Sequence, residues 1–310
     1  MGLDAHSINS ISATTRICAV YGHPVKHSAS PTMHNAAMES LGLDWRYVAY
    51  DVLPENLREA IAGAAAMKFV GLNLTVPHKL LAMEIVNEFD DSARTWGAVN
   101  TVLFEGEIGG GEWKPMRDCN PEEVQAVRTR GFNTDADAIT RSIQEDLGIS
   151  LAGKTVLLLG AGGAGRTAAL KLASDGVKQL HLVNRTMSKA EAVANEIRAR
   201  FPNVEIKLGY PEGTVDLVVN GTSAGLKADD PLPFDTQLFS LKKAAAAYDM
   251  IYRPAQTRFL QEAERSGCKF ANGLGMLLYQ GAKALEIWSG KNPPIEIMRR
   301  ALQQQIYGRS

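Results

Sequence analysis

A glycine-rich turn between an apolar strand and a helix constrains this chain more than any other feature. The turn has the sequence GAGGAG, which matches G-x-G-x-x-G; it follows the apolar run 155–159 and opens a predicted helix over 166–174. The first glycine permits a tight turn, the second lets the backbone approach a pyrophosphate, and the third allows close helix–strand packing. The helix start also offers unpaired N–H groups to an anion. We therefore predict a Rossmann-type unit whose cofactor contacts are Gly160, Ala161, Gly162, Gly163, Ala164 and Gly165.

The end of the next predicted strand, 179–183, indicates which dinucleotide binds. Units that bind NAD carry a carboxylate at about this point, which hydrogen-bonds the ribose 2′-hydroxyl. This chain instead has Asn184, Arg185 and Thr186, followed by Lys189. Arg185 and Lys189 can pair with a phosphate, and Arg185 can also stack on adenine. We predict NADP rather than NAD, with these four residues around the 2′-phosphate; the alternative for Arg185 is a solvated surface side chain.

Composition excludes several classes of protein. The chain has 310 residues, which predicts about two domains at ~100–200 residues each. Its formal net charge is −1 at pH 7, without a long basic run, and this argues against nucleic-acid binding. The three cysteines lie far apart, as expected for reduced thiols in the cytoplasm. No apolar run reaches the ~20 residues that cross a bilayer, so no membrane association is predicted.

Strands and helices alternate along most of the chain, and this predicts an α/β fold with a mostly parallel sheet. One interruption is the segment 105–130, which contains three consecutive glycines and two prolines and predicts a surface loop, a hairpin or a lid. Another expectation concerns 79–89, which has the pattern of a helix. The helices expected around the glycine unit cover 135–147 and 188–200, and the last one covers 274–288.

Four polar segments lie outside the glycine unit, at 22–35, 73–79, 97–101 and 131–135. Each follows a predicted strand or precedes a helix, where open α/β sheets gather ligand groups. With the glycine turn, their order and spacing resemble the shikimate dehydrogenase family from about Arg16 to Trp288. Enzymes of that family reduce 3-dehydroshikimate to shikimate with NADPH, on the route to chorismate and the aromatic amino acids. The resemblance implies a Rossmann-type NADP domain over 135–274, inserted in a smaller α/β substrate domain made of 1–134 and 275–310.

The resemblance also implies roles for single residues. Lys79 matches the catalytic lysine and Asp135 its carboxylate partner, so the pair would move the proton. Taken alone, Lys79 is a surface lysine at a helix start, and Asp135 is an N-terminal helix residue. The other implied substrate contacts are hydroxyl and amide groups, which suit a polyhydroxy carboxylate: Ser28, Ser30, Thr75, Asn100, Tyr252 and Gln280. The implied contacts near the nicotinamide are Thr222, Ser223, Met250 and Gly273.

Two departures from the family pattern leave the substrate open. The segment 105–130 is longer than the family's short hairpin, and Ala138 stands where glycine is usual. A quinate/shikimate or aminoshikimate dehydrogenase is therefore an alternative, and a ligand-sensing regulator without activity is a third hypothesis. The histidines at 23, 27 and 34 have no acid or cysteine at a zinc spacing, so no metal is expected. The expected partner is a small-molecule substrate, and both a monomer and a homodimer remain open.

Overall fold

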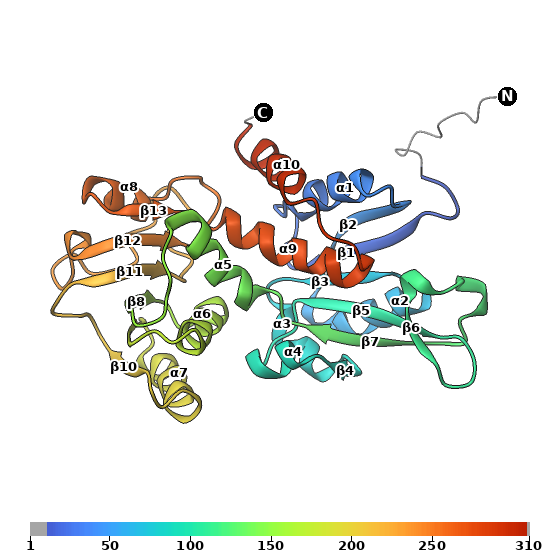
Figure 1. The fold of residues 1–310 in the computed structure, drawn as a ribbon, viewed down its shortest axis with the longest axis horizontal. Coiled ribbons are helices and arrows are strands. Elements are labelled where there is room, and N and C mark those ends of the chain that lie inside the picture. Colours follow the sequence, from blue (N-terminus) through green and yellow to red (C-terminus); the bar gives the residue numbers. More distant parts are fainter. Residues whose placement is uncertain (1–10, 309–310) are drawn as a thin grey trace. The chain divides into compact units, whose positions relative to one another are not determined.

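The computed structural model describes residues 11–308, and the chain divides into two compact units (Figure 1). The first unit comprises Met1–Thr134 and Gln280–Ser310, and the second comprises Asp135–Tyr279. The second unit is thus inserted in the sequence of the first. The chain returns to the first unit within helix α9 (Leu274–Ser289), at 280, whereas the sequence analysis placed this return at 275.

The sheet of the second unit is parallel at every described pairing. Its strand order is β10-β9-β8-β11-β12-β13, which is the order of the Rossmann fold. The two central strands, β8 and β11, send their connections to opposite sides, and this creates the switch point at which such sheets bind ligands. The strands are β8 (Thr155–Leu159), β9 (Gln179–Val183), β10 (Glu205–Leu208), β11 (Val215–Asn220), β12 (Ala244–Asp249) and β13 (Lys269–Ala271).

Helices cover this sheet and explain why β8 is apolar after its first residue. Leu157 and Leu159 of β8 share a buried cluster with Phe259 and Leu260 of α8. Helix α6 packs against β8 and also contacts α5 and α7. A strand buried on both faces has no solvent-facing position, so the sequence shows a continuous apolar run rather than an alternation. The helices are α5 (Asp135–Leu147), α6 (Gly163–Ser174), α7 (Met187–Arg200) and α8 (Arg258–Arg265).

The sheet of the first unit has the order β2-β1-β3-β5-β7-β4, with β6 paired to β5. Strand β5 is antiparallel to each of its partners, and the other described pairings are parallel. All the described strands except β5 therefore run in one direction, as the predicted mostly parallel sheet requires. The strands are β1 (Arg16–Gly22), β2 (Trp45–Asp51), β3 (Gly71–Leu74), β4 (Glu88–Phe89), β5 (Thr101–Glu107), β6 (Trp113–Pro115) and β7 (Ala126–Phe132).

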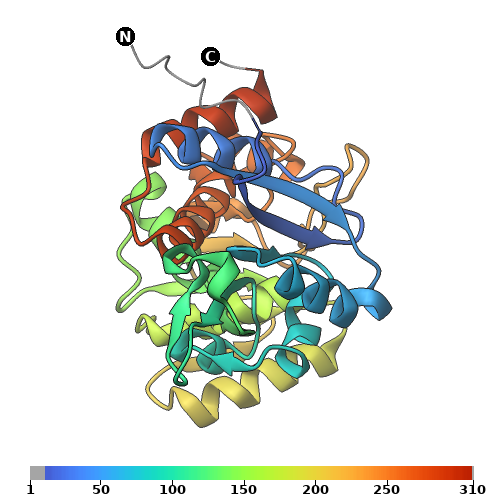
Figure 2. The same cartoon turned by 90° about the vertical axis from the view of Figure 1, so that its right-hand side faces the viewer.

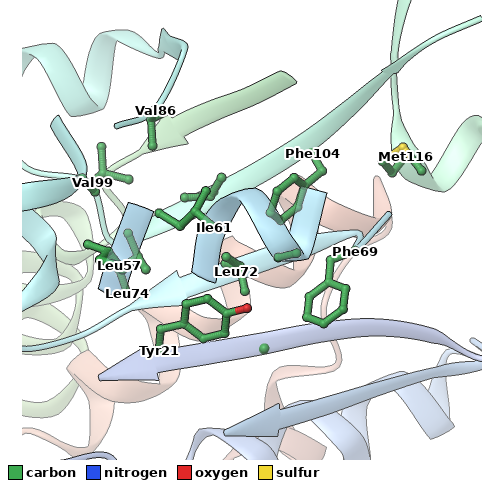
Figure 3. Close-up of a cluster of buried hydrophobic side chains, with 14 of the residues drawn as sticks. Tyr21, Leu57, Ile61, Phe69, Leu72, Leu74, Val86, Val99, Phe104 and Met116 are labelled. Atoms are coloured by element: carbon green, nitrogen blue, oxygen red, sulfur yellow. The ribbon is translucent and has the colours of Figure 1, made fainter. Parts of the chain in front are cut away.

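One face of this sheet packs against helix α2 (Leu57–Ala66), as Figure 3 shows. Its buried residues Leu57, Ile61 and Ala64 follow the spacing of one helical face. They join Leu72 of β3 and Phe104 of β5 in the main apolar cluster of the unit. Burying each large side chain of this kind contributes about 1.5–3 kcal/mol, so the cluster fixes the sheet that carries the polar loops.

The remaining helices of the first unit are α1 (Ser30–Ser40), α3 (His78–Leu81), α4 (Asp91–Trp96) and α10 (Ile295–Tyr307). Helix α10 lies beside α1 in both ribbon views (Figures 1 and 2). The end of α9 is fixed to the sheet by Trp288, which is fully buried and whose indole N–H donates to the carbonyl of Val102 at 3.0 Å. A Cβ on Gly71 would overlap this indole, so only glycine fits beneath it.

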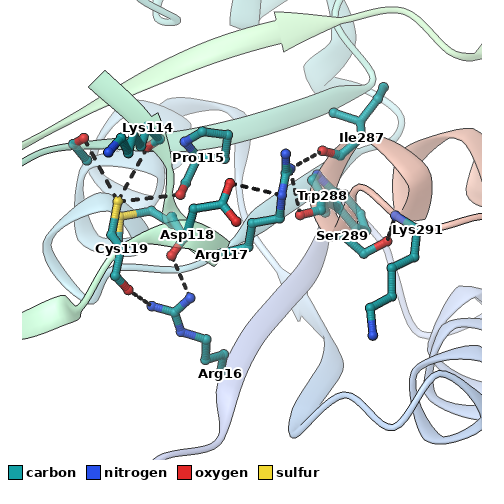
Figure 4. Close-up of polar contacts among 12 residues, drawn as sticks. Arg16, Lys114, Pro115, Arg117, Asp118, Cys119, Ile287, Trp288, Ser289 and Lys291 are labelled. Carbon is teal, nitrogen blue, oxygen red and sulfur yellow. Dashed lines mark hydrogen bonds and ion pairs between the residues drawn. The ribbon is translucent and has the colours of Figure 1, made fainter. Parts of the chain in front are cut away.

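The segment 105–130 is a braced hairpin rather than an irregular loop. Strand β5 extends to Glu107, β7 begins at Ala126, and β6 lies between them on the edge of β5. Figure 4 shows how the connection is held. Arg16 donates to the carbonyl groups of Met116 and Cys119, and Arg117 donates to two carbonyl groups in the last turn of α9 at 2.9 and 3.1 Å.

The direction of β5 decides which edge of the sheet this hairpin occupies. Because β5 is antiparallel to β3, its last residue lies where β1 and β3 begin. Arg16, which anchors the hairpin, is itself the first residue of β1. Of the three alternatives from the sequence, the hairpin is the one found. It braces the amino-terminal edge of this sheet and does not cover the opposite edge.

The helix expected over 79–89 is much shorter in the structure. Helix α3 covers His78–Leu81, a 3-10 turn follows at Ala82–Glu84, and β4 begins at Glu88. Asn87 ends the helical path because its backbone N–H donates to the Thr129 hydroxyl at 3.0 Å and its side chain accepts the Thr129 N–H at 2.9 Å. This pairing with β7 overrides the local helix propensity.

Candidate active site

The glycine turn lies at the switch point of the second sheet, between the ends of β8 and β11. Gly160 has φ +104°, a conformation that favours glycine. A Cβ there would lie 2.9 Å from the Thr222 methyl group and 3.0 Å from the backbone of Gly221. A Cβ on Gly165 would overlap the carbonyl of Gly160. These two glycines are therefore required for the packing of the loops that follow β8 and β11.

The start of helix α6 has the properties of an anion site. The helix runs over Gly163–Ser174, and its N-cap, Gly162, supplies no side-chain hydrogen bond. No acidic residue lies in its first turn. Apart from the adjacent residues and the backbone of the helix itself, a Cβ on Gly162 or Gly163 would meet no atom of residues 11–308 within 4 Å, so the space in front of the turn is open. Unpaired N–H groups facing open space at a positive helix end suit a pyrophosphate.

A basic pair follows β9 at the same edge. The Asn184 side chain accepts the N–H of Ala161 at 2.9 Å and donates to the carbonyl of Thr186, so it connects the turn to the 184–189 segment. The side chains of Arg185 and Lys189 are exposed and make no hydrogen bond or ion pair within the described part of the chain. By contrast, Arg166 is held by two bonds to one carboxylate on α7. Two unengaged cations and no carboxylate at this strand end fit a 2′-phosphate.

The loops after β11 and β12 complete this edge. Asn220, the last residue of β11, accepts both the N–H and the hydroxyl of Thr222, at 3.1 and 2.7 Å, and donates to the carbonyl of Ala224. This fixes the turn that carries Thr222 and Ser223. Gly273 approaches the loop after β12 so closely that a Cβ would overlap the carbonyl of Met250. Thr222, Ser223, Met250 and Gly273 are thus parts of one packed set of loops.

Tyr252 and Asp135 also belong to the second unit. Burial raises the pKa of Tyr252, and the adjacent Arg253 acts in the opposite direction. Asp135 is buried and is the first residue of α5. The first turn of α5 is tied to α6 by the ion pair between Asp137 and Lys171, at 2.9 Å. Burial acts to lower the pKa of Lys171, but hydrogen bonds with Asp175 and Asp137 outweigh it and raise this pKa, so the tie stays charged at neutral pH.

The predicted serines and threonine lie at the carboxyl edge of the first sheet. Ser28 and Ser30 follow β1 at the start of α1, and the N–H of Ser30 donates to the Ser28 hydroxyl at 3.3 Å. Thr75 follows β3, and its N–H donates to the carbonyl of Tyr21 at 2.9 Å. A Cβ on Gly22 would overlap the Thr75 methyl group. The structure therefore brings Thr75 against the chain that leads from β1 towards the two serines.

Asn100 is the centre of a buried polar network in the same unit. Its side-chain oxygen accepts the N–H of Thr134 at 2.8 Å, and its amide group donates to the Thr134 hydroxyl at 2.9 Å. Asn73 donates to the Asn100 carbonyl at 3.2 Å and to the Thr101 hydroxyl at 3.0 Å, and it accepts the Tyr47 hydroxyl at 2.7 Å. Because a backbone N–H can only donate, the orientation of the Asn100 amide is fixed, and its remaining free group is an N–H donor.

Lys79 lies in helix α3, which follows β3, and it is half-buried. Its carbonyl accepts the N–H of Val99 at 2.9 Å, so the backbone of Lys79 is tied to the segment that carries Asn100. Gln280 is half-buried and is the first residue of α9 that belongs to this unit. The predicted substrate residues Ser28, Ser30, Thr75, Lys79, Asn100 and Gln280 therefore belong to the first unit, whereas Asp135 and Tyr252 share the second unit with the predicted cofactor residues.

The structure does not place the histidines near the start of the chain in a metal site within residues 11–308. His34 is fully buried and stacks on Tyr47, with ring centroids 4.2 Å apart. Burial lowers its pKa to about 3, so the ring is neutral. His23 instead pairs with Asp51 at 2.6 Å. Within residues 11–308, no group of three or more histidine, cysteine, aspartate or glutamate side chains is arranged to hold a metal ion.

Sequence reasoning gave no role to Asn73, Thr101 or Thr134, although each lies in a polar segment that it singled out. The available signal was a polar residue at the end of an apolar strand, where a buried side chain needs a hydrogen-bond partner. Which partner it finds depends on β3, β5 and β7 being neighbours. Sequence spacing alone does not contain that information.

No helix in the described part of the chain has the length and apolar character that crossing a bilayer requires.

Three family models match successive parts of the chain. Residues 20–102 match the shikimate dehydrogenase substrate binding domain, residues 141–224 match shikimate/quinate 5-dehydrogenase, and residues 273–303 match the shikimate 5′-dehydrogenase C-terminal domain. The matched ranges include the serine pair, the glycine turn and Gln280 in turn.

Similar proteins span nearly the whole chain. Shikimate dehydrogenase (NADP⁺) of Methanopyrus kandleri is 37% identical over 305 residues, which cover 96% of this chain and 98% of that protein. A crystal structure of a shikimate dehydrogenase in complex with NADP⁺ is 37% identical, has a TM-score of 0.82, and the match covers 96% of this chain and 98% of that one. The 5-ketofructose reductase of a Gluconobacter strain is 32% identical with a TM-score of 0.77, and the match covers 94% and 99% of the two chains.

Proposed function

This chain belongs to the shikimate dehydrogenase family, and from that premise we propose that it catalyses the reversible, NADPH-dependent reduction of 3-dehydroshikimate to shikimate. It is thus an NADP-dependent oxidoreductase acting on a CH–OH group, in the pathway to chorismate and the aromatic amino acids. The observation that carries this proposal is the basic pair Arg185 and Lys189, exposed and unengaged within the described residues, beside an open glycine turn in a chain of this family.

The second unit has the groups that NADPH needs. The N–H groups at the start of α6 would bind the pyrophosphate, and Arg185 and Lys189 the 2′-phosphate. Thr222, Ser223, Met250 and Gly273 would hold the nicotinamide side. When bound, NADPH supplies the hydride that reduces the substrate ketone.

The first unit supplies the groups that suit the substrate. Ser28 and Ser30 would donate hydroxyl hydrogen bonds to its carboxylate. Thr75, Asn100 and Gln280 would bind its ring hydroxyl groups. The free N–H of Asn100 makes this residue a donor towards the substrate. Tyr252, from the second unit, would contact the substrate beside the nicotinamide.

The proton step falls to Lys79 and Asp135. We assign the Lys79 ammonium group to donate a proton to the carbonyl oxygen as the ketone becomes an alcohol, and Asp135 to orient that ammonium group by a charge-assisted hydrogen bond. In the reverse direction Lys79 takes the same proton back. Support for the assignment comes from the family motif, from the burial of Asp135, and from the backbone bond between Lys79 and the Asn100 segment.

The finer properties are also proposals. We propose that the enzyme works in the cytoplasm, without nucleic acid, as a monomer or homodimer. The net charge of −1 supports the absence of a nucleic-acid partner, and the three buried free cysteines agree with a reducing compartment.

The test is NADPH oxidation, followed at the nicotinamide absorbance, with 3-dehydroshikimate and with 3-dehydroquinate. The proposed function requires kcat/KM to be larger for 3-dehydroshikimate; a preference for 3-dehydroquinate would assign the quinate alternative instead. Lys79→Ala should lower kcat by about 10²–10⁴-fold while NADPH still binds. Full activity in Lys79→Ala would refute its role. Tight substrate binding by a wild type that shows no turnover would favour the ligand-sensing regulator.

A further inference from the structure

A buried carboxyl group that has no role in the proposal above connects the loops on the nicotinamide side. Asp249 is the last residue of β12, and its side chain is fully buried. It accepts hydrogen bonds from the Thr257 hydroxyl, from the N–H of Ile251 at 3.0 Å, and from the Asn220 amide at 3.0 Å. These three donors come from the N-cap of α8, from the loop after β12 and from the end of β11.

The Asp249 carboxylate is one of three groups that hold the Asn220 amide in its orientation, together with the N–H of Thr222 and the carbonyl of Ala224. An ionised carboxylate only accepts hydrogen bonds, so it binds the NH₂ group of Asn220. The oxygen of Asn220 then faces Thr222, whose N–H and hydroxyl it accepts at 3.1 and 2.7 Å. The Thr222 hydroxyl in turn accepts the N–H of Ala224 at 3.0 Å. Asp249 therefore braces Asn220, the residue whose side chain holds the 222–224 turn.

The same carboxylate also fixes the loop after β12. Its bond to the N–H of Ile251 closes a turn around Met250, whose own N–H donates to the carbonyl of Asn220 at 3.0 Å. The carbonyl of Ile251 then accepts the N–H of Gly273 at 3.1 Å. Asp249 thus holds every segment that we assign to the nicotinamide side, either directly or through one intervening residue, Asn220 or Ile251.

We propose that Asp249 is a positioning residue for hydride transfer: it holds the 222–224 and 250–252 loops in the arrangement that orients the nicotinamide. This inference rests on the proposed function. It gives Asp249 no contact with cofactor or substrate. Its effect should therefore fall on the chemical step and on the nicotinamide end, and should leave the binding of the adenosine end unchanged.

The ionisation of Asp249 gives the role a pH signature. Burial raises its pKa to about 6, against the opposing effect of its three hydrogen-bond donors. The groups that face it from β11 and α8, Asn220 and Thr257, do not titrate. On its own strand Tyr248 stays neutral here because burial raises its pKa. Below about pH 6 the protonated carboxyl group loses an acceptor position, so we expect the hydrogen bonds to the two loops to rearrange and turnover to fall.

The experiment compares wild type with Asp249→Asn and with a control, Asp216→Asn. Asp216 lies on β11 near the opposite, amino end of the same sheet, where it accepts the N–H of Thr155 at 2.9 Å and pairs with Lys154. Three quantities are measured: kcat with NADPH, the Kd of adenosine 2′,5′-bisphosphate, and the fluorescence of bound NADPH. We expect kcat to fall about 10- to 100-fold in Asp249→Asn, with the Kd unchanged and an altered emission. The acid limb of kcat near pH 6 should disappear in this variant and persist in Asp216→Asn.

A second pair of variants covers the case in which Asp249→Asn fails to fold. Thr257→Val removes one donor and keeps the side-chain shape, so it should lower kcat less than Asp249→Asn, and Thr257→Ser should restore it. Wild-type kcat in Asp249→Asn or in Thr257→Val would overturn the proposal. A loss of bisphosphate affinity equal to the loss of kcat would also overturn it, because the effect would then be general damage. If wild type does not reduce 3-dehydroshikimate, the proposed reaction is wrong, and the positioning role is judged by NADPH fluorescence alone: unchanged emission in Asp249→Asn would refute it.

Discussion

The carboxyl edges of the two sheets are built by different means. At the edge of the second sheet, the glycine turn packs through the absence of side chains, and the space in front of Gly162 and Gly163 is open. At the edge of the first sheet, Asn100 is locked by side-chain hydrogen bonds to Thr134 and by its neighbour Asn73. One edge is a backbone surface for an anion, and the other is a set of oriented polar groups. A backbone surface tolerates changes in neighbouring side chains, whereas an oriented network depends on each of its members.

In this comparison, the largest effect on activity should come from removing the two cations that we assign to the 2′-phosphate beside the glycine turn. Replacing Arg185 and Lys189 together by alanine removes the charge-assisted bonds to the 2′-phosphate, each worth about 1.5–3 kcal/mol. We expect kcat/KM for NADPH to fall about 100-fold or more, while kcat/KM for NADH changes little. Steady-state kinetics with both cofactors checks this. The matched control is Lys178→Ala with Arg198→Ala on the same unit, and an equal loss with NADPH and NADH would contradict the assignment.

The two edges also differ in how far they follow from the sequence. The family and the fold class were predicted, and the comparisons confirm them. NADP and the reaction were predicted as well, and they are the cofactor and the activity named for the similar proteins. The glycine turn is readable because its conformational demands are local: Gly160 needs its positive φ, and Gly165 must clear the turn that precedes it. The site residues assigned by family resemblance stay predictions.

The remainder required the tertiary structure. The network around Asn100 unites residues from β2, β3, β5 and the end of β7, and their adjacency is a property of strand order. The helical path that begins with α3 ends before residue 89 because Asn87 pairs with Thr129, which is distant in sequence. The sequence of 105–130 allowed a loop, a hairpin or a lid, because its glycines and prolines are turn residues in any context. Its place in the sheet is set by the reversed direction of β5.

Two glycines of the same turn should separate packing from binding. Gly165→Ala places a methyl group against the Gly160 carbonyl, and overpacking of this kind costs about 1–3 kcal/mol of unfolding free energy. In Gly162→Ala the methyl group meets no described atom within 4 Å apart from the adjacent residues, and Gly162 has a negative φ. The free energy of unfolding should therefore stay within about 0.5 kcal/mol of wild type. It should nevertheless weaken NADPH binding because the methyl group occupies the space before the helix start. Urea unfolding and NADPH titration of both variants measure this, and equal destabilisation by the two would contradict it.

The pH dependence of stability should distinguish the buried carboxyl group of the second unit from ordinary surface acids. The pKa of Asp249 is about 6 in the folded protein and ordinarily 3.8, so the folded state binds more protons between these values. Its contribution to stability is therefore present at low pH and is lost as the pH rises through this window, by about 2–3 kcal/mol. Surface acids change the stability in the opposite direction as the pH rises. Because wild type and Asp249→Asn carry the same surface acids, their effect cancels in the difference between the two proteins. The unfolding free energy of wild type minus that of Asp249→Asn should thus fall from pH 4 to pH 7, and a constant difference would show that Asp249 titrates normally.

Among the changes expected to destabilise the protein, the smallest effect should come from the amino-terminal edge of the first sheet, where the 105–130 hairpin lies and no predicted site residue is found. Arg117 places a cation and two N–H donors on the last carbonyl groups of α9, where the helix dipole favours positive charge. Arg117→Met should cost about 1–2 kcal/mol of unfolding free energy. It should leave kcat and KM within about twofold, because the hairpin lies at the amino edge of the sheet and surface changes away from a site act mainly on stability.

Lys114→Met, which removes an exposed ion pair of the same hairpin, is the control and should change stability by less than about 0.5 kcal/mol. A substantial rise in substrate KM in Arg117→Met would mean that α9 transmits the position of its end to Gln280, and the two edges of this sheet would then not be independent.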